Sequence, residues 1–475
     1  MTELHELTAA EQLRAVRDRT VSSTELTQHY LTRIDKFGEE LGAFVTVTAG
    51  LALDEAARAD DRLARGDWAP LLGLPIGIKD LYATAGVRTT SGSAALNDNV
   101  PAADSWTVGL LRRAGAVVVG KTNAAEFGAT CFTENDVTAH PAVTPYHRSR
   151  YSSGSSGGAA TAVAAGLLPV AHAGDGAGST RTPAATCHLV GVKPSRGLVS
   201  SAPQTAFFST TIEGPIARTV ADAALLLDVM AEPWPGDLYG WRPQRSFADA
   251  IEDDPSGRLS IAMWTHTGLD GVEPHPESVR AVQRAATLLR ELGHEVREIA
   301  IPAGYPEPVR RAMERLFEIA IAAGVPAIVP PERRELLTPY TRHLLARGAE
   351  LSGTEVMIDQ AILARYASTF LAALAGFDAA LTPTTNGPPV PLGHFLEDGV
   401  EGVGNRMLAW SCHTPWANLA GVPAVSLPSH LDDAGLPVGV QLVGRARGDG
   451  DLLALAAQLE RAGLWADVHP SCWHQ

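Results

Sequence analysis

The chain has 475 residues, of which 45% are hydrophobic, and a formal net charge of −15 at pH 7. It is long enough to bury a large core. The acidic balance and the absence of a basic stripe argue against nucleic acid or an anionic membrane as a partner.

The cysteines place the chain in a reducing compartment. Cys131, Cys187, Cys412 and Cys472 lie far apart and form no C-x-x-C pair, so we expect free thiols and a cytoplasmic location. The N-terminal residues are polar and acidic, unlike a signal peptide, and no unbroken 18-residue apolar run predicts a membrane span. The 15 histidines include no H-E-x-x-H or similar ligand set, so no metal site is expected.

The N-terminal region of the chain is predicted to be helical over residues 1–65. Ser22 and Glu25 form a capping box at the start of one helix. A second, amphipathic helix is expected over residues 52–65, where Gly66 ends it.

Two strands are expected next. Residues 71–78 form an apolar strand that leads to Lys79, residues 105–113 a helix, and the β-branched residues 116–119 a buried strand. Residues 115–122 also satisfy the phosphate-loop expression G-x-x-x-x-G-K-[ST]. In a true phosphate loop the four intervening residues curl around phosphates, but here they are the strand, and consecutive valines resist such a curl. We therefore expect no nucleotide binding.

Two Ser/Gly clusters organise the segment 152–194. The first is Gly-Ser-Ser-Gly-Gly at 154–158, and the second is Gly-Asp-Gly-Ala-Gly-Ser at 174–179. Flexible linkers of this composition border polar sequence, whereas residues 159–170 predict a buried helix and 184–192 are also apolar. Buried glycine-rich turns can point backbone N–H groups at a ligand, and a serine at the end of such a turn can be a nucleophile.

A serine nucleophile needs a base, and Lys79 ends an apolar run where a buried, neutral lysine would be expected. A lone lysine is otherwise a solvated surface charge. Residues 154–158 also match the G-x-S-x-G nucleophile elbow, which would make Ser156 the nucleophile. That elbow requires a preceding apolar strand, and residues 147–153 are not one.

The rest of the chain alternates between strands and helices, which favours an α/β sheet with helices on both faces. Helices are expected over 219–230, 277–292, most of 303–375 and 451–462, and strands over 259–264, 295–301, 377–381 and 424–427.

Three motifs in this order resemble the amidase signature family. They are Gly-Leu-Pro-Ile-x-Ile-Lys-Asp at 73–80, the first Ser/Gly cluster, and Asp-x-x-Gly-Ser-x-Arg-x-Pro-Ala at 175–184. Ser155 and Ser179 are 24 residues apart, as the family's pattern requires. Further family-like segments extend the resemblance over nearly the whole chain, at 120–127, 214–223, 382–384, 421–424 and 436–441.

The resemblance implies an α/β amidase signature fold, in which a large mixed β-sheet is sandwiched between α-helices. One amidase domain is then expected over residues 1–475. It divides into an N-terminal helical region (1–65), a catalytic core (66–231), a variable region that shapes the substrate site (232–375) and a return to the core sheet (376–475).

For function, the resemblance implies a serine hydrolase that cleaves acyl–nitrogen bonds of small molecules through an acyl-enzyme. It assigns Ser179 as the nucleophile, Ser155 as the bridging serine after a cis peptide bond, and Lys79 as the base. The hydroxyls of Ser155 and Ser179, rather than carboxylates, are expected around Lys79, since Asp80 points to the opposite face of the strand. The oxyanion hole would consist of backbone N–H groups of Gly176, Ala177, Gly178 and Ser179.

The remaining site residues also follow from the resemblance, which implies no cofactor and no metal. Residues expected to support the site through hydrogen bonds are Ser156, Asp175 and Arg181. A segment that lines the acyl pocket in relatives corresponds to Gly128, Ala129, Thr130, Cys131 and Phe132. Phe132 would form an apolar wall there, although such a phenylalanine more often lies in the core.

Departures from the family pattern leave the substrate open. Many members carry Thr-Asp-Thr-Gly-Gly-Ser where this chain has Gly-Asp-Gly-Ala-Gly-Ser at 174–179, and Thr180 replaces a common Ile. Aryl amides, linear and cyclic amides and acyl hydrazides all remain candidates, and the chain alone or a homodimer could act on them. The alternative is a glutaminase-type component of a multi-subunit, tRNA-dependent amidotransferase, which would need partner chains and prefer free glutamine.

Overall fold

The computed structural model describes residues 3–204, 209–255 and 257–475. The first two residues of the polar N-terminus, on which the signal-peptide expectation partly rests, lie outside these ranges. Within them, no helix is both long enough and apolar enough to span a membrane.

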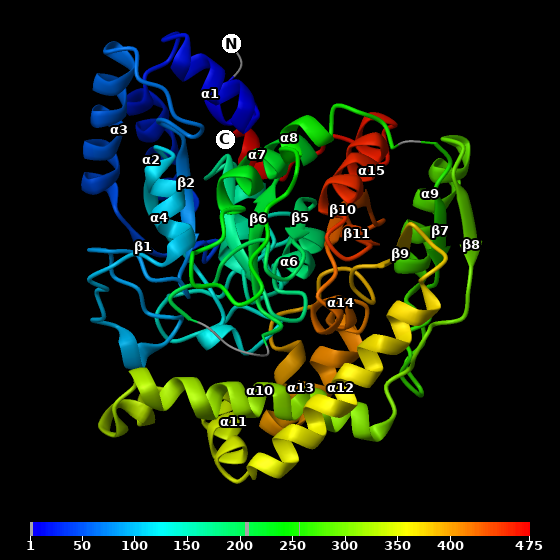
Figure 1. The fold of residues 1–475 in the computed structure, drawn as a ribbon. Coiled ribbons are helices and arrows are strands. Elements are labelled where there is room, and N and C mark those ends of the chain that lie inside the picture. The colour runs from blue at the N-terminus through cyan, green and yellow to red at the C-terminus, as the bar shows by residue number, and fades with distance from the viewer. Residues whose placement is uncertain (1–2, 205–208, 256) are drawn as a thin grey trace.

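An 11-stranded sheet forms the centre of the fold, in the order β1-β3-β2-β4-β6-β5-β10-β11-β9-β7-β8 (Figure 1). The pairs that β2 makes with β3 and β4, and β7 with β8 and β9, are parallel, and the others are antiparallel. The strands are β1 Phe44–Val47, β2 Pro75–Lys79, β3 Val117–Thr122, β4 Val170–Asp175, β5 Val190–Lys193, β6 Ile212–Ala217, β7 Ser260–Met263, β8 Glu295–Glu298, β9 Ala379–Pro383, β10 Ala424–Leu431 and β11 Pro437–Gly444.

Helices cover both faces of the sheet. One face packs against α4, α7, α9 and α15, and the other against α5 and, near the β1 edge, α2 and α3. The helices are α1 Ala9–Arg17, α2 Ser23–Phe37, α3 Ala49–Ala64, α4 Trp106–Arg113, α5 Gly157–Ala164, α6 Arg181–Thr186, α7 Val220–Met230, α8 Phe247–Ala250, α9 Pro276–Glu291, α10 Glu307–Ile328, α11 Pro339–Ala349, α12 Gly353–Ala373, α13 Gly399–Ser411, α14 Pro415–Ala420 and α15 Asp449–Arg461. The predicted class, a mixed sheet sandwiched between helices, is confirmed.

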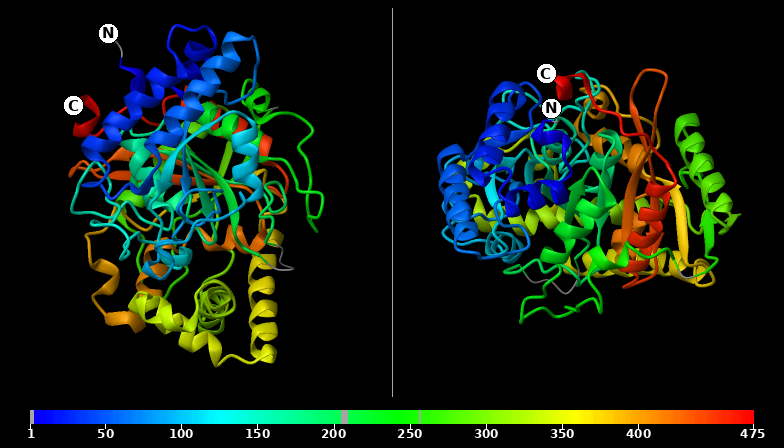
Figure 2. Two further views of the ribbon diagram at one scale, coloured as in Figure 1. Left: turned by 90° about the vertical axis from the view of Figure 1, so that its left-hand side faces the viewer. Right: turned by 90° about the horizontal axis from the view of Figure 1, so that it is seen from above.

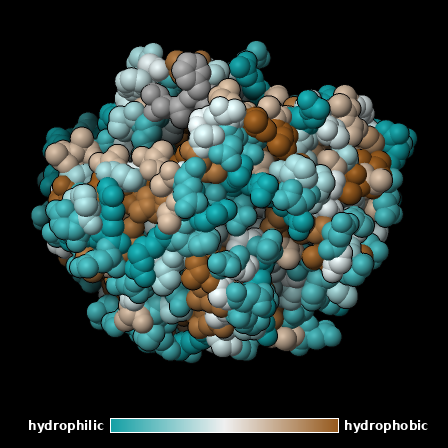
Figure 3. Space-filling model, turned by 90° about the horizontal axis from the view of Figure 1, so that it is seen from below, coloured by the Kyte–Doolittle hydropathy of each residue, from teal (hydrophilic) through white to brown (hydrophobic). Residues whose placement is uncertain are grey.

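A separate helical layer lies below the sheet (Figure 2). It contains α10, α11 and α12, and it corresponds to the region 303–375 that was expected to be helical. Seen from below, hydrophilic residues cover most of the molecule's face, with hydrophobic residues scattered among them in small groups (Figure 3). This layer borders the candidate active site.

Some predicted elements have other bounds in the structure, and some observed elements were not predicted. The N-terminal region also contains a strand, β1, which pairs with β3. The helix expected over 159–170 ends at Ala164, because the chain turns at Gly166, with a φ of 67°, before β4 begins. Strands β4, β5, β6 and β11 and helices α6, α8, α13 and α14 were not predicted.

The phosphate-loop match is a strand, as predicted. Gly120, Lys121 and Thr122 end β3, and the buried Lys121 Nζ donates hydrogen bonds to Tyr82 O at 2.5 Å and to the hydroxyls of two neighbouring threonines. The lysine is therefore already surrounded by protein acceptors. All four cysteines are free thiols, with Cys131 half-buried and the others buried.

Candidate active site

Lys79 occupies the end of β2, where the strand meets the two Ser/Gly loops. Its side chain is 1% exposed. The Nζ atom lies 2.8 Å from Ser155 Oγ, 2.7 Å from Ser156 Oγ and 3.0 Å from Gly174 O. No carboxylate is hydrogen-bonded to it among the described residues, although such a partner is the usual one for a buried lysine.

Lys79 Nζ donates all three hydrogen bonds, which matches the three N–H groups of the ammonium form. In the neutral form, which has two N–H groups and one lone pair, one of the three contacts reverses. Gly174 O can only accept, and Ser156 Oγ donates to that same carbonyl at 3.2 Å, so Ser155 is the hydroxyl left to donate to the lone pair. The site therefore allows a neutral Lys79 to accept the proton of Ser155.

Burial also favours the neutral form of Lys79. Burial lowers the pKa of Lys79 to about 7, while the carboxylates of Asp175 and Glu213 act in the opposite direction. The expectation that hydroxyls alone surround Lys79 is therefore only partly right. The hydroxyls are those of Ser155 and Ser156 rather than Ser179, and two carboxylates lie near enough to act on the charge.

The first Ser/Gly loop places Ser155 and Ser156 at the start of α5. The peptide bond between Gly154 and Ser155 is cis, as the resemblance predicted. A side-chain carbon at Gly154 would lie 2.7 Å from the backbone nitrogen of Phe132, so only glycine fits there. No strand leads into this loop and Ser156 is fully buried, so the loop lacks the strand that a nucleophile elbow requires.

The second Ser/Gly loop joins β4 to α6 and carries Ser179. The Ser156 N–H donates to Ser179 O at 3.2 Å, which holds the two loops together. Ser179 is half-buried and lines a cavity with Gly154. Among the described residues nothing is hydrogen-bonded to Ser179 Oγ, so the contact between the two serine hydroxyls is not formed in this structure.

The predicted oxyanion hole needs one correction. The Gly178 N–H donates to Asp175 Oδ1 at 2.6 Å and is therefore already engaged. In the described part of the chain, the N–H groups of Gly176, Ala177 and Ser179 have no partner. Ala177 is not among the residues with a positive φ, so its side chain fits the loop without strain.

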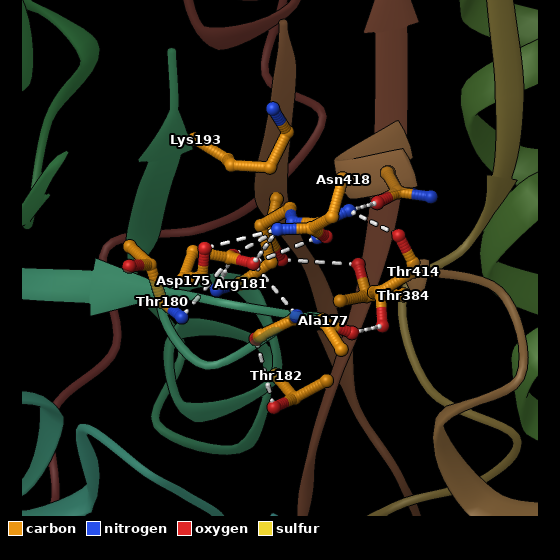
Figure 4. Close-up of polar contacts among 12 residues, drawn as sticks. Asp175, Ala177, Thr180, Arg181, Thr182, Lys193, Thr384, Thr414 and Asn418 are labelled. Carbon is orange, nitrogen blue, oxygen red and sulfur yellow. Dashed lines mark hydrogen bonds and ion pairs between the residues drawn. The ribbon is translucent and has the colours of Figure 1, made fainter. Parts of the chain in front are cut away.

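A buried ion pair between Asp175 and Arg181 holds the second Ser/Gly loop in place (Figure 4). Arg181, fully buried, donates to both oxygens of Asp175, at 2.9 Å each. Burial alone would raise the pKa of Asp175, but the Arg181 guanidinium holds it well below its usual value. Both residues were predicted to support the site through hydrogen bonds, and the structure places them accordingly.

Three residues that the sequence did not assign complete this network. Arg181 also donates to Asn418 Oδ1 and Gln441 Oε1, both at 2.5 Å. Thr414 Oγ1 donates to Ala177 O at 2.6 Å (Figure 4). Gln441 lay in a family-like segment, which was the available signal, whereas Thr414 and Asn418 lay in none.

A cavity of about 370 Å³ opens in front of Ser179. Four of the five residues predicted for the acyl pocket line it, namely Gly128, Ala129, Thr130 and Cys131. The prediction for Phe132 is wrong: this ring is 5% exposed and stacks on Phe395 at a centroid distance of 5.1 Å, inside an aromatic core cluster. The outer lining comes from α10, α11 and α13.

One group of side chains among the described residues could offer three metal ligands. The ligand atoms of Glu3, His5 and His29 lie within 4.8 Å of one another. His5 Nδ1 and His29 Nε2 are hydrogen-bonded at 3.0 Å, and His5 Nε2 bonds to Trp473 O. None of the three lines the cavity with Ser179. No local motif marks this group, because His29 is far from the other two in the chain.

Comparison with known proteins identifies the family. The family model described as Amidase matches residues 25–453. The chain belongs to the amidase signature family. Putative amidase AmiA2 of Mycobacterium tuberculosis is 38% identical over 98% of this chain and 95% of its own length.

Two further relatives differ in their described activities. A glutamyl-tRNA(Gln) amidotransferase subunit of Desulforapulum autotrophicum is 34% identical over 97% of this chain and 98% of its own. The structure of 6-aminohexanoate cyclic dimer hydrolase superposes with a TM-score of 0.90 at 29% identity, covering 99% of this chain and 100% of the other. This amidase is accordingly an amidohydrolase of carbon–nitrogen bonds other than peptide bonds.

Proposed function

We propose that this amidase hydrolyses acyl–nitrogen bonds of small molecules through an acyl-enzyme on Ser179, with Ser155 and Lys79 as the proton relay. The observation that carries the proposal is the buried Lys79 Nζ, 2.8 Å from Ser155 Oγ, with a pKa lowered to about 7 by burial. A lysine at its ordinary pKa would be almost wholly protonated at neutral pH and could not act as a base.

The proposed first half-reaction moves one proton along two serines. Neutral Lys79 Nζ takes the proton of Ser155 Oγ, which takes the proton of Ser179 Oγ once that hydroxyl turns toward it. Ser179 Oγ then forms a bond to the acyl carbon. The negative oxygen that develops accepts hydrogen bonds from the free N–H groups of Gly176, Ala177 and Ser179.

The carbon–nitrogen bond then breaks, and the leaving nitrogen receives, through Ser155, the proton that Lys79 had taken, which completes the first half-reaction. In the second, water attacks the acyl carbon of the ester on Ser179 and the relay takes the proton of the water. The bond between the acyl carbon and Ser179 Oγ breaks, Ser179 Oγ receives a proton back from the relay, and the acid leaves. The Arg181–Asp175 pair supports both halves because it holds the loop whose N–H groups face the reacting oxygen.

We also propose that the chain is a single amidase domain in which the region 232–375 shapes the substrate site. Support comes from the cavity lining, which includes eight residues of α10 between Glu307 and Glu318 and two residues of α11, beside the loop of Ser179. Acyl hydrazides belong among the proposed substrates because their scissile bond is also acyl–nitrogen.

The experiment that tests the nucleophile is acyl trapping. The protein is mixed with an activated aryl ester, quenched in acid and mapped by mass spectrometry. We expect a stoichiometric adduct on Ser179, absent from Ser179→Ala, together with loss of amide hydrolysis to background in that variant. An adduct on Ser156 instead would overturn the assignment.

The relative described as an amidotransferase component keeps the glutaminase alternative in view. The two functions separate when the purified chain is offered glutamine beside aryl amides, linear and cyclic amides and acyl hydrazides. We expect turnover of amides or hydrazides by the chain alone and little of glutamine. A preference for glutamine that appears only with partner chains would favour the alternative.

A further inference from the structure

The cavity in front of Ser179 has a charged wall built by one helix. Successive turns of α10 contribute ionisable side chains to the lining, namely Glu307, Arg310, Arg311, Glu314, Arg315 and Glu318. The wall therefore carries both signs of charge. Whether it favours a cationic or an anionic ligand depends on which of these groups already have partners.

The arginines of the wall are largely occupied. Arg311 forms an ion pair with Glu307 at 3.8 Å. Arg315 is bound by two carboxylates of α12, Glu355 at 3.2 Å and Asp359 at 3.4 Å. Their charges are thus balanced locally, although Arg310 is exposed and has no ion pair in the described part of the chain.

The carboxylate of Glu318 is only half satisfied. The residue is 1% exposed, and its Oε1 lies 3.5 Å from Arg347 Nε. Its Oε2 is buried and has no hydrogen-bond partner in the described part of the chain. Burial raises the pKa of Glu318, and Arg347 counteracts this. A buried acceptor without a donor carries a desolvation penalty of about 1–3 kcal/mol, so a donor from a ligand would be favoured there.

Glu314 adds a second carboxylate to the same wall. It is exposed and takes part in no ion pair or hydrogen bond among the described residues. Opposite it, on α13, lies Gly404. A side-chain carbon at Gly404 would lie 3.6 Å from Glu314 Oε1 and 3.8 Å from Tyr340 Oη, so these two oxygens border the same space.

We propose that Glu314 and Glu318 bind a hydrogen-bond-donating group, best a protonated amine, at the end of the substrate remote from the scissile bond. They would thereby select amides with such a terminus over those with an anionic one. The remaining lining includes the apolar side chains Met313, Phe317 and Met407, which suit an aromatic or alkyl body. This inference rests on the proposed function for the position of the scissile bond.

The test measures binding, so that it does not depend on turnover. The Ser179→Ala protein is titrated by calorimetry with benzamide, 4-(aminomethyl)benzamide and 4-carboxybenzamide. A charge-assisted hydrogen bond predicts that the aminomethyl ligand binds about tenfold more tightly than benzamide, and the carboxylate more weakly. The isosteric changes Glu314→Gln and Glu318→Gln, added singly, should each reduce that advantage, and the double change should abolish it.

Glu307→Gln is the matched control, because Glu307 lies on the same helix and lining but is paired with Arg311. It should keep the tenfold preference. Equal affinity for the two ligands, undetectable binding of the aminomethyl ligand, or a preference that survives the double change would overturn the inference. Preferential binding without any amide hydrolysis by the wild type would instead count against the proposed function alone.

Discussion

Glu213 lies directly opposite Gly174 in the antiparallel pair of β4 and β6. Gly174 O accepts a hydrogen bond from Lys79 Nζ, and the buried carboxylate of Glu213 bonds to His172 Nε2 at 2.7 Å. A side-chain carbon at Gly174 would lie 2.0 Å from Tyr82 Oη, so glycine permits this packing. The carboxylate of Glu213 thus lies two strands from the proposed base, because β4 separates β6 from β2, and it opposes the effect of burial on the pKa of Lys79.

Removing that charge should make Lys79 easier to deprotonate. In Glu213→Gln the ammonium form loses a stabilising carboxylate, so the pKa of Lys79 falls and the acidic limb of kcat/KM moves to lower pH. Steady-state kinetics between pH 5 and 10 checks this. Glu55→Gln removes a partly buried carboxylate that does not act on Lys79, and it should leave the limb in place; an equal shift in both variants would contradict the prediction.

The pH dependence of kcat/KM in the wild-type protein should show the ionisation of Lys79. We expect kcat/KM to rise through one ionisation near pH 7, the pKa to which burial lowers Lys79, onto a neutral-to-alkaline plateau. Lys79→Ala should lose nearly all acylation, and Lys79→Arg should not restore it, because a guanidinium does not give up its proton. Substantial activity in Lys79→Arg would show that a fixed positive charge suffices.

The same pKa predicts a slope in stability. The folded-state pKa of Lys79 is about 7 and its ordinary value is 10.5, so between these limits the unfolded chain binds more protons than the folded one. Lys79 therefore increases the free energy of unfolding as pH rises from 7 toward 10.5, by at most about 5 kcal/mol. Denaturant titrations at several pH values should show a flatter curve for Lys79→Met; parallel curves would contradict this.

The sequence predicted those elements of the site that lie in short local motifs. Lys79 ends an apolar run, and the two Ser/Gly clusters supply Ser155 and Ser179 together with the loop N–H groups. It could not predict Asn418 or Gln441 as partners of Arg181, because these residues come from α14 and β11, which meet the loop of Arg181 only in the folded protein.

The fold, too, could be predicted only in part. Its class followed from the alternation of strands and helices, but β6 contains Gly214 and Pro215, which a strand pattern normally excludes. Phe132 was predicted to line the pocket because it adjoins the segment that does so in relatives. In the structure its ring stacks on Phe395 in the core. Glu314 and Glu318 carry no local motif, so only the packing of α10 beside the loop of Ser179 marks them.

Cys131 should report on the cavity without affecting the core. Its N–H donates to Met407 Sδ at 3.2 Å, and its side chain lines the cavity. Cys131→Trp should therefore raise KM or abolish turnover while the protein stays folded by circular dichroism. Phe132→Ala provides the contrast, since it should cost about 3–5 kcal/mol of stability by leaving a hole beside Phe395. Unchanged kinetics of Cys131→Trp with every substrate would place this segment away from the acyl group.

Ser155 and Ser156 both contact Lys79 and should nevertheless differ sharply in effect. Ser155 is the only proposed link between Lys79 and Ser179, so Ser155→Ala should lower kcat by several orders of magnitude. Ser156 Oγ accepts a hydrogen bond from Lys79 Nζ and donates one to Gly174 O, so Ser156→Ala removes a support while the lone pair can still face Ser155. We expect a weakened but measurable enzyme, with its acidic limb retained. Single-turnover kinetics on an activated amide distinguishes the two variants, and a greater loss in Ser156→Ala than in Ser155→Ala would require the proton path to run through Ser156 instead.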